Sequence, residues 1–343
     1  MPIKTTCIGA WPKPDYVPHM AWFHEAAQTG AADAEGLSEA ERTAIFDRAT
    51  QEAVAEQAAL GIDIPTDGEI RRANYVHYHC SHLAGFELDT LTECTMRNGA
   101  WTAEVPSFTA KIQAGAPFLV RDWQVAQEAT DRPVKITVPG PLTISDSTAD
   151  LVYGDRQAWC ADLADALNVE IRRLADAGCQ HIQVDEPLFA RLPDQALAFG
   201  VENLERCFAG VSEVVTRTMH MCCGYPDKLD ETDYVKADPE VYQRLATALD
   251  ESLIDAVSLE DAHRHNDLSL LEKFARTTVI FGAVEIASSR VESVEEILER
   301  LRAACDHIDK ERLMAAPDCG LIMLGSDLTR AKLRNLVAAA AQL

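Results

Sequence analysis

Short apolar runs alternate along the chain with longer stretches in which apolar residues recur every third or fourth position. Short runs are typical of buried strands, and the longer periodicity is typical of amphipathic helices. The predicted strands are residues 5–10, 64–69, 134–140, 181–186, 216–222, 256–260, 278–284 and 313–320. Because strands and helices alternate strictly, the pattern predicts a parallel sheet with right-handed crossovers.

Local capping signals place several helices between these strands. Ser38 and Ser293 each stand three residues before a glutamate, which is the spacing of a capping box. Gly178 is expected to end the helix at 155–177, since glycine adopts the left-handed conformation of a C-cap without strain. Further helices are expected at 239–252, 268–276 and from 326 to the end.

Eight strand–helix units in 343 residues suit a closed (β/α)8 barrel better than an open sheet. No linker rich in proline, glycine or serine divides the chain. The sequence therefore predicts an α/β protein with one TIM-barrel domain over residues 1–343. The irregular segment at about 70–118 is expected to be an insertion after the second strand, with a hairpin of its own.

Charge narrows the range of partners. Lysine and arginine number 31 and aspartate and glutamate 55, which gives a formal net charge of −24. Nucleic acid and anionic membrane surfaces would be repelled, so neither is an expected partner. No apolar run approaches a membrane span or the core of a signal peptide, so we expect a cytoplasmic protein. In that reducing compartment the ten cysteines are expected to be thiols, metal ligands or nucleophiles.

Polar residues that suit catalysis or metal binding follow the predicted strands, where TIM barrels carry their active sites. His220 and Cys222 are two apart on one strand, so both point to the same face. Glu260 and Cys319 end two further strands. One imidazole, two thiolates and one carboxylate form a ligand set that suits tetrahedral zinc. The alternative is a core histidine beside small, apolar cysteines.

Other histidines leave several interpretations open. His77, His79 and His82 lie with Cys80 in the predicted insertion, where they suit substrate contacts or packing better than a second metal site. His263 and His265 are interpreted as loop residues near the mouth of the barrel.

Several short motifs resemble the catalytic barrel of the cobalamin-independent methionine synthase family, within the superfamily of uroporphyrinogen decarboxylase. They are Thr6-Cys7-Ile8-Gly9-Ala10, Asp67-Gly68-Glu69, Gly140-Pro141-Leu142-Thr143-Ile144, Ile182-Gln183-Val184-Asp185-Glu186-Pro187, His220-Met221-Cys222, Ser258-Leu259-Glu260 and Pro317-Asp318-Cys319-Gly320-Leu321. The resemblance implies zinc held by His220, Cys222, Glu260 and Cys319. It also implies that Glu69 and Asp185 hold the amino group of a homocysteine-like substrate, and that Ile8, Gly9 and Ala10 line its carboxylate.

Four departures from the family pattern bear on the methyl donor and on proton transfer. Ala10 replaces a serine of the amino-acid pocket, and Ala287 replaces a histidine that donates a proton to the leaving group. Ser147 stands near the place of a tryptophan that stacks on folate, and Arg191 near that of a folate-contacting glutamate. With the net charge of −24, these losses favour a donor other than polyglutamyl folate, such as a methylcorrinoid protein.

The predicted activity is zinc-dependent methyl transfer to the thiol of homocysteine, which forms methionine. Zinc favours the thiolate, and the thiolate is the nucleophile. Asp185 and Glu69 can also be interpreted as a general acid–base pair. The proton for the leaving group is expected to come from one of these carboxylates, from His77 or from His79. Alternatives are alkyl transfer to another thiol such as coenzyme M, a lyase of the uroporphyrinogen decarboxylase type, and a non-catalytic zinc barrel. Two carboxylates beside the cluster favour an amino-acid thiol.

Overall fold

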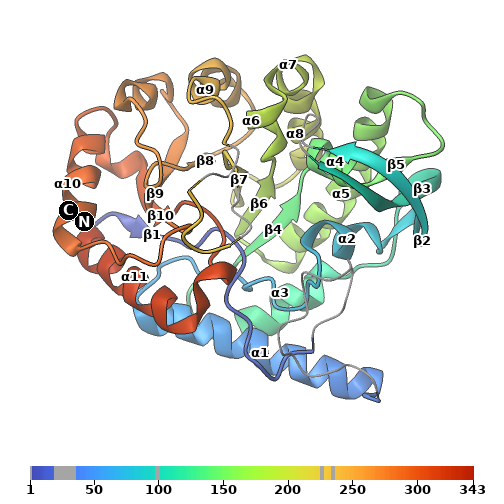
Figure 1. Cartoon of the computed structure of the whole chain (residues 1–343), viewed down its shortest axis with the longest axis horizontal. Coiled ribbons are helices and arrows are strands. Elements are labelled where there is room, and N and C mark those ends of the chain that lie inside the picture. Colours follow the sequence, from blue (N-terminus) through green and yellow to red (C-terminus); the bar gives the residue numbers. More distant parts are fainter. Residues whose placement is uncertain (1, 19–35, 97–100, 225–227, 233–235) are drawn as a thin grey trace.

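A curled parallel β-sheet forms the centre of the molecule, and helices cover its outer face (Figure 1). The computed structural model describes residues 2–18, 36–96, 101–224, 228–232 and 236–343. The sheet has the strand order β1-β10-β9-β8-β7-β6-β4. Its strands are β1 (Lys4–Thr5), β4 (Lys135–Pro139), β6 (His181–Asp185), β7 (Thr216–Met221), β8 (Ala256–Leu259), β9 (Thr278–Val284) and β10 (Leu313–Pro317).

The two edge strands of this sheet, β1 and β4, are joined through the segment around Ile64 and Thr66. Thr6 forms a parallel bridge with Ile64, and Thr66 forms one with Lys135. The side chain of Gln57 bonds both the N–H and the carbonyl of Thr66, at 2.9 Å each. The Gln57 amide thus occupies backbone groups of Thr66 that would otherwise pair with a neighbouring strand. Isolated bridges therefore replace most of the strand predicted at 64–69. The strand predicted at 5–10 is likewise short.

Helices lie where the capping signals predict them. Ser38 and Ser293 both form complete capping boxes, and Gly178 ends its helix in the left-handed conformation at φ 108°. The segment predicted at 268–276 is a 3-10 helix, η2 (Leu268–Lys273), rather than an α-helix. The α-helices outside the hairpin region are α1 (Glu39–Leu60), α3 (Leu119–Gln127), α4 (Pro141–Ser147), α5 (Arg156–Ala177), α6 (Leu188–Arg191), α7 (Pro193–Gln195), α8 (Val201–Phe208), α9 (Val241–Glu251), α10 (Val294–Cys305) and α11 (Gly325–Ala340).

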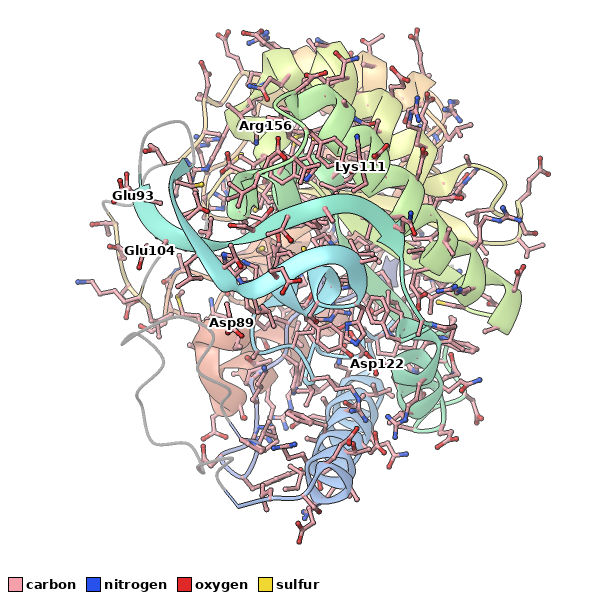
Figure 2. All side chains as sticks on the ribbon, turned by 90° about the vertical axis from the view of Figure 1, so that its right-hand side faces the viewer. Asp89, Glu93, Glu104, Lys111, Asp122 and Arg156 are labelled. Carbon is pink, nitrogen blue, oxygen red and sulfur yellow. The ribbon has the colours of Figure 1, made fainter. Side chains whose placement is uncertain are left out.

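A long antiparallel hairpin occupies the segment for which the sequence predicts an insertion. It consists of β2 (Leu83–Met96) and β3 (Trp101–Ala114), and it follows the short helix α2 (Tyr75–Cys80). The strand β5 (Ala149–Asp150) pairs with β3 as a third member of this sheet. Figure 2 shows the hairpin lying across one side of the molecule, with Asp89, Glu93 and Glu104 along it.

Apolar side chains between the sheet and its helices form the main core. Leu163, Leu167 and Ile171 of α5 are fully or almost fully buried, as are Ile182 and Val184 of β6. Each such side chain stabilises the fold by about 1.5–3 kcal/mol through its removal from water. Among the described residues, no helix is both long and apolar enough to cross a lipid bilayer.

Candidate active site

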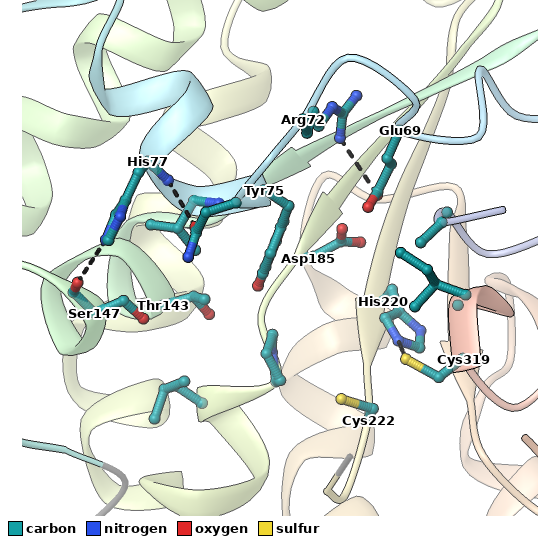
Figure 3. A pocket seen from close by; sticks show the side chains of 18 of the residues that line it. Glu69, Arg72, Tyr75, His77, Thr143, Ser147, Asp185, His220, Cys222 and Cys319 are labelled. Atoms are coloured by element: carbon teal, nitrogen blue, oxygen red, sulfur yellow. Dashed lines mark hydrogen bonds and ion pairs between the residues drawn. The ribbon is translucent and has the colours of Figure 1, made fainter. Parts of the chain in front are cut away.

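A cavity of about 490 Å³ opens at the carboxyl ends of the parallel strands, and Figure 3 shows its inner wall. Glu69, Asp185, His220, Cys222 and Cys319 all line it. The hairpin contributes Met96, Ala103 and Val105 to the outer wall. The strand ends and the hairpin therefore enclose one site that holds most of the residues singled out in the sequence.

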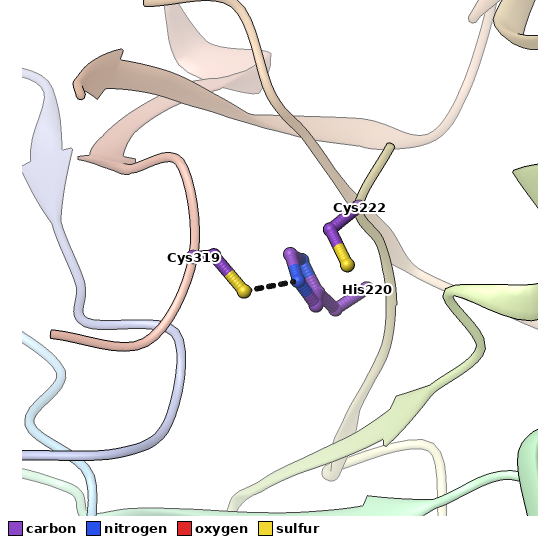
Figure 4. A group of neighbouring side chains, drawn as sticks. All are labelled: His220, Cys222 and Cys319. Carbon is purple, nitrogen blue, oxygen red and sulfur yellow. Dashed lines mark hydrogen bonds between the residues drawn. The ribbon is translucent and has the colours of Figure 1, made fainter. Parts of the chain in front are cut away.

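Three potential metal ligands lie together in this cavity (Figure 4). The ligand atoms of His220, Cys222 and Cys319 all lie within 4.8 Å of one another. The Nδ1 atom of His220 bonds the hydroxyl of Ser258 at 2.9 Å, and its Nε2 atom faces Cys319 Sγ at 3.5 Å. A polar partner on the far ring nitrogen is the usual way in which a metal-binding histidine is oriented. One imidazole and two sulfurs in this arrangement fit a metal ion that favours soft ligands.

The two cysteines of this cluster shift each other's pKa in opposite directions. A hydrogen bond from Cys319 lowers the pKa of Cys222 well below its usual value, and His220 adds to that shift. The same bond raises the pKa of Cys319 well above its usual value, and burial adds to the rise. The thiolate form is therefore favoured at Cys222 rather than at Cys319. A metal ion would favour ionisation of both.

Glu260, the fourth predicted ligand, lies beside the cluster but outside the group of close ligand atoms. Its Oε2 atom accepts a hydrogen bond of 2.7 Å from the Cys223 backbone N–H and faces His263 Nε2 at 3.6 Å. Burial raises the pKa of this carboxyl group well above its usual value. His263 is itself buried, and its Nδ1 donates to Asp318 at 2.8 Å. His263 does lie in the loop after β8, as the sequence indicates, but its side chain points into the structure and links Asp318 to Glu260.

Glu69, which also lines the cavity, is held by a buried network. It adopts a left-handed backbone conformation at φ 55°, after Gly68 at φ 71°. Its Oε1 accepts a hydrogen bond of 2.6 Å from the Thr137 hydroxyl and lies 3.3 Å from an Arg72 nitrogen. Arg72 also bonds Asp67 at 3.1 Å. Non-glycine residues in this conformation store strain, which is typical of functional sites.

Asp185 ends β6 and faces the same cavity. Its Oδ1 accepts a hydrogen bond of 2.7 Å from the Gln183 amide, which also donates to the Ile8 carbonyl at 2.8 Å. Lys135 in turn donates to Gln183 at 2.6 Å. Burial raises the pKa of Asp185 to about 7, and the charge of Glu69 contributes to the rise. A bound cation would relieve both effects, so Glu69 and Asp185 together suit an ammonium group.

Ile8, Gly9 and Ala10 lie on the cavity wall. The backbone of Gly9 passes close enough to the Glu69 carboxylate to leave no room for a side chain, and the carbonyl of Ala10 accepts a hydrogen bond of 2.7 Å from Leu321 N–H. These contacts tie the segment after β1 to the loops that carry Glu69 and Cys319.

His77 and His79 of α2, and His82 just after this helix, take separate roles. His77 lines the cavity, and its Nε2 atom lies 3.1 Å from the Ser147 carbonyl. His79 is buried, with its Nδ1 atom 2.7 Å from the Tyr75 carbonyl. His82 stacks on Phe118 with ring centroids 4.0 Å apart. Within the described residues these histidines do not belong to a metal-ligand group.

The positions that depart from the family pattern divide into two sets. Ser147 and Arg191 line the cavity. Ala287 is buried and lies outside the lining, and its carbonyl accepts a hydrogen bond of 2.7 Å from Asp230 N–H.

Several residues of the site escaped the sequence interpretation. Tyr75, Arg72 and Lys13 line the cavity, and Thr137 and Gln183 fix the two acidic side chains. Figure 3 shows Tyr75 extending from α2 towards Asp185. Burial raises the pKa of Tyr75 well above its usual value, so the phenol stays neutral. The sequence signal for this network was the pair Arg71 and Arg72 after Glu69. Adjacent arginines next to a strand end often form ion pairs with buried carboxylates.

Fold and site define an α/β enzyme with a thiol-rich group of metal ligands at the carboxyl edge of its parallel sheet. Residues 3–342 match the family described as "Cobalamin-independent synthase, Catalytic domain", and the chain belongs to this family. Its members' chemistry makes the protein a methyltransferase.

Individual relatives are similar to this protein over nearly the whole chain. The methionine synthase of Sulfolobus acidocaldarius is 29% identical over 98% of this chain and 90% of its own length. The methionine synthase of Thermococcus kodakarensis is also 29% identical, over 98% of this chain and 91% of its own length. The crystallised B12-independent methionine synthase from Shewanella sp. W3-18-1, in complex with selenomethionine, superposes with a TM-score of 0.87 at 28% identity, covering 99% and 97% of the two chains.

Proposed function

We propose that the protein transfers a methyl group to the thiol of homocysteine and forms methionine, with zinc held by His220, Cys222, Cys319 and Glu260. One observation carries the proposal: the His–Cys–Cys group and the two carboxylates Glu69 and Asp185 line the same cavity. The selenomethionine bound to the relative from Shewanella supports an amino-acid ligand of this size and chemistry.

We also propose that the sheet is a closed eight-stranded barrel in a single domain, with the segment around Ile64 and Thr66 as its second strand. The bridges Thr6–Ile64 and Thr66–Lys135 support this, because they connect the two edge strands. Closure would place the carboxyl ends of all eight strands around one mouth, as in TIM-barrel enzymes. The α2–β2–β3 segment would be an insertion that walls this mouth.

Two acidic groups on one side of the cavity would fix the substrate ammonium. Glu69 is anchored by Thr137 and Arg72, and Asp185 by Gln183, so neither carboxylate needs to reorganise when the ligand binds. Preorganised charges of this kind orient a substrate at low entropic cost. The thiol of a substrate held there would point towards the His220 side of the cavity.

Zinc would supply charge that keeps the bound thiol ionised at neutral pH, as a generator of the nucleophile. His220 is oriented for this role by Ser258, and the hydrogen bond from Cys319 favours the thiolate form of Cys222. Glu260 stands next to the group, anchored through Oε2 by the Cys223 N–H. A carboxylate held at one oxygen is suited to complete a ligand set with the other oxygen.

The methyl donor we propose is not a polyglutamyl folate, and a methylcorrinoid protein is the candidate. The cavity has Ser147 on its lining, and its outer wall is made of the apolar side chains Met96, Ala103 and Val105. A net charge of −24 disfavours the polyanionic glutamate tail of such a folate.

We propose that the reaction takes place in the cytoplasm, because all ten cysteines are free thiols and a reducing compartment keeps thiols in this form.

The test is a methyl-transfer assay on zinc-loaded protein, with homocysteine and with coenzyme M as acceptors. Methylcobalamin and methyl-tetrahydrofolate triglutamate serve as donors, and mass spectrometry detects the methylated thiol. We expect methionine from homocysteine and methylcobalamin, lost in Cys222→Ser but retained in Cys305→Ser, which lies outside the cavity. Methylation of coenzyme M alone would favour the other thiol, and activity retained in Cys222→Ser would contradict the proposed zinc site.

A further inference from the structure

Lys13 is a half-buried cation on the wall of the active-site cavity, four residues after Gly9. Its Nζ atom donates a hydrogen bond to the backbone carbonyl of Arg72. An ammonium group carries three N–H donors, so this bond leaves two for a ligand. Burial lowers the pKa of Lys13 to about 8, and the Glu69 carboxylate opposes that shift. Lys13 is therefore positively charged at neutral pH and close to Glu69.

The other cations of the cavity have different partners or positions. The guanidinium of Arg72 is committed to Asp67, Thr137 and Glu69, and the residue is only 3% exposed. Arg191 lies on α6, on the side of Cys222, whose pKa its charge lowers. Among the lining residues that the structure describes, Lys13 is thus the cation that acts on Glu69 and keeps donors for a ligand.

The chemistry of an amino acid fixes where its carboxylate must lie. The ammonium and the carboxylate are attached to the same carbon atom, so a substrate with its ammonium at Glu69 and Asp185 has its carboxylate next to them. Ala10 and Gly9, on the adjoining backbone, offer no side-chain donor there. We propose that Lys13 binds the carboxylate of the amino-acid substrate and so selects amino-acid thiols over simple aminothiols. This inference rests on the proposed function.

The test compares ligands that differ only in the carboxylate. L-Methionine and 3-(methylsulfanyl)propan-1-amine share the thioether and the ammonium group, and isothermal titration calorimetry on the zinc-loaded protein measures both dissociation constants. The parent protein should bind methionine more tightly than the amine. In Lys13→Met we expect methionine affinity to fall about 10- to 100-fold, as for a lost charge-assisted hydrogen bond, with little change for the amine.

Two further variants separate the carboxylate contact from other effects. Lys13→Arg should retain part of the preference, because a cation remains. Lys111→Met removes the same charge from an exposed hairpin position and should behave as the parent. Equal weakening of both ligands in Lys13→Met, or an unchanged preference, would overturn the role of Lys13 while leaving the proposed function intact. Failure of the parent protein to bind either ligand would overturn both.

Discussion

The backbone of Gly9 lies so close to the Glu69 carboxylate that a Cβ atom at residue 9 would stand 2.5 Å from Glu69 Oε1. Real Cβ atoms do not approach an oxygen this closely, and Thr137 and Arg72 hold the carboxylate in place. The absence of a side chain at residue 9 therefore determines where the acidic group stands in the cavity.

Gly9→Ala should displace Glu69 and weaken the binding of the substrate ammonium. We expect KM for homocysteine to rise about 10-fold or more, as for a lost hydrogen bond to a charged group, with a folded protein by circular dichroism. The effect should be absent when Glu69 has already been removed. If Gly9→Ala raises KM as much in the Glu69→Ala background as in the parent, the two residues act independently and the interpretation is wrong.

Metal binding should depend on each member of the His–Cys–Cys group. Cys222→Ser and Cys319→Ser each replace a soft thiolate by a hydroxyl, so we expect less than one equivalent of tightly bound zinc after gel filtration, measured by plasma mass spectrometry. Glu260→Gln should bind zinc about 10- to 100-fold more weakly than the parent, in competition with a chromophoric chelator. Cys305→Ser is the matched control, and unchanged zinc in the Cys222→Ser protein would rule out this site.

Stability should depend strongly on Arg72, because its guanidinium compensates two buried carboxylates. In Arg72→Met, Asp67 and Glu69 would lose their cation in a site of low exposure, and we expect a loss of about 3–5 kcal/mol in the free energy of unfolding. Urea unfolding followed by tryptophan fluorescence measures it. Arg206→Met, at an exposed ion pair, should change stability by less than about 1 kcal/mol. A similarly small loss for Arg72→Met would show that the network is not stabilising.

The pH dependence of stability should include a contribution from His181 at the start of β6, at the end of the strand opposite Asp185. Burial lowers its pKa from 6.5 to about 4, with further contributions from Lys135 and Lys4. The unfolded chain binds the extra proton between these values, so stability is fully present above pH 6.5 and is lost as the pH falls towards 4. His181→Gln removes this dependence.

Unfolding of both proteins in urea at pH 7.5 and 5.0 measures the effect. We expect the parent to lose about 2 kcal/mol more than His181→Gln over this interval. Parallel curves for the two proteins would show that the native state accepts the proton on His181 without cost.

Local sequence signals determined much of the secondary structure. Ser38 and Ser293 carry capping boxes that the structure contains, and the strand predicted at 278–284 has the same bounds as β9. These features depend on residues a few positions apart, so periodicity and capping chemistry suffice to predict them. The spacing of His220 and Cys222 likewise placed both on one face of a strand, and the structure brings them together with Cys319.

Only the tertiary structure decided how the site is completed. The hydrogen bond from Cys223 N–H to Glu260, the ring of His263 between Asp318 and Glu260, and the anchoring of Glu69 by Thr137 join segments far apart in the chain. The hairpin wall and the position of Lys13 beside Glu69 also depend on packing. The sequence by itself determined which chemical groups end each strand. The distances between those groups follow from strand register and loop packing, which no local pattern encodes.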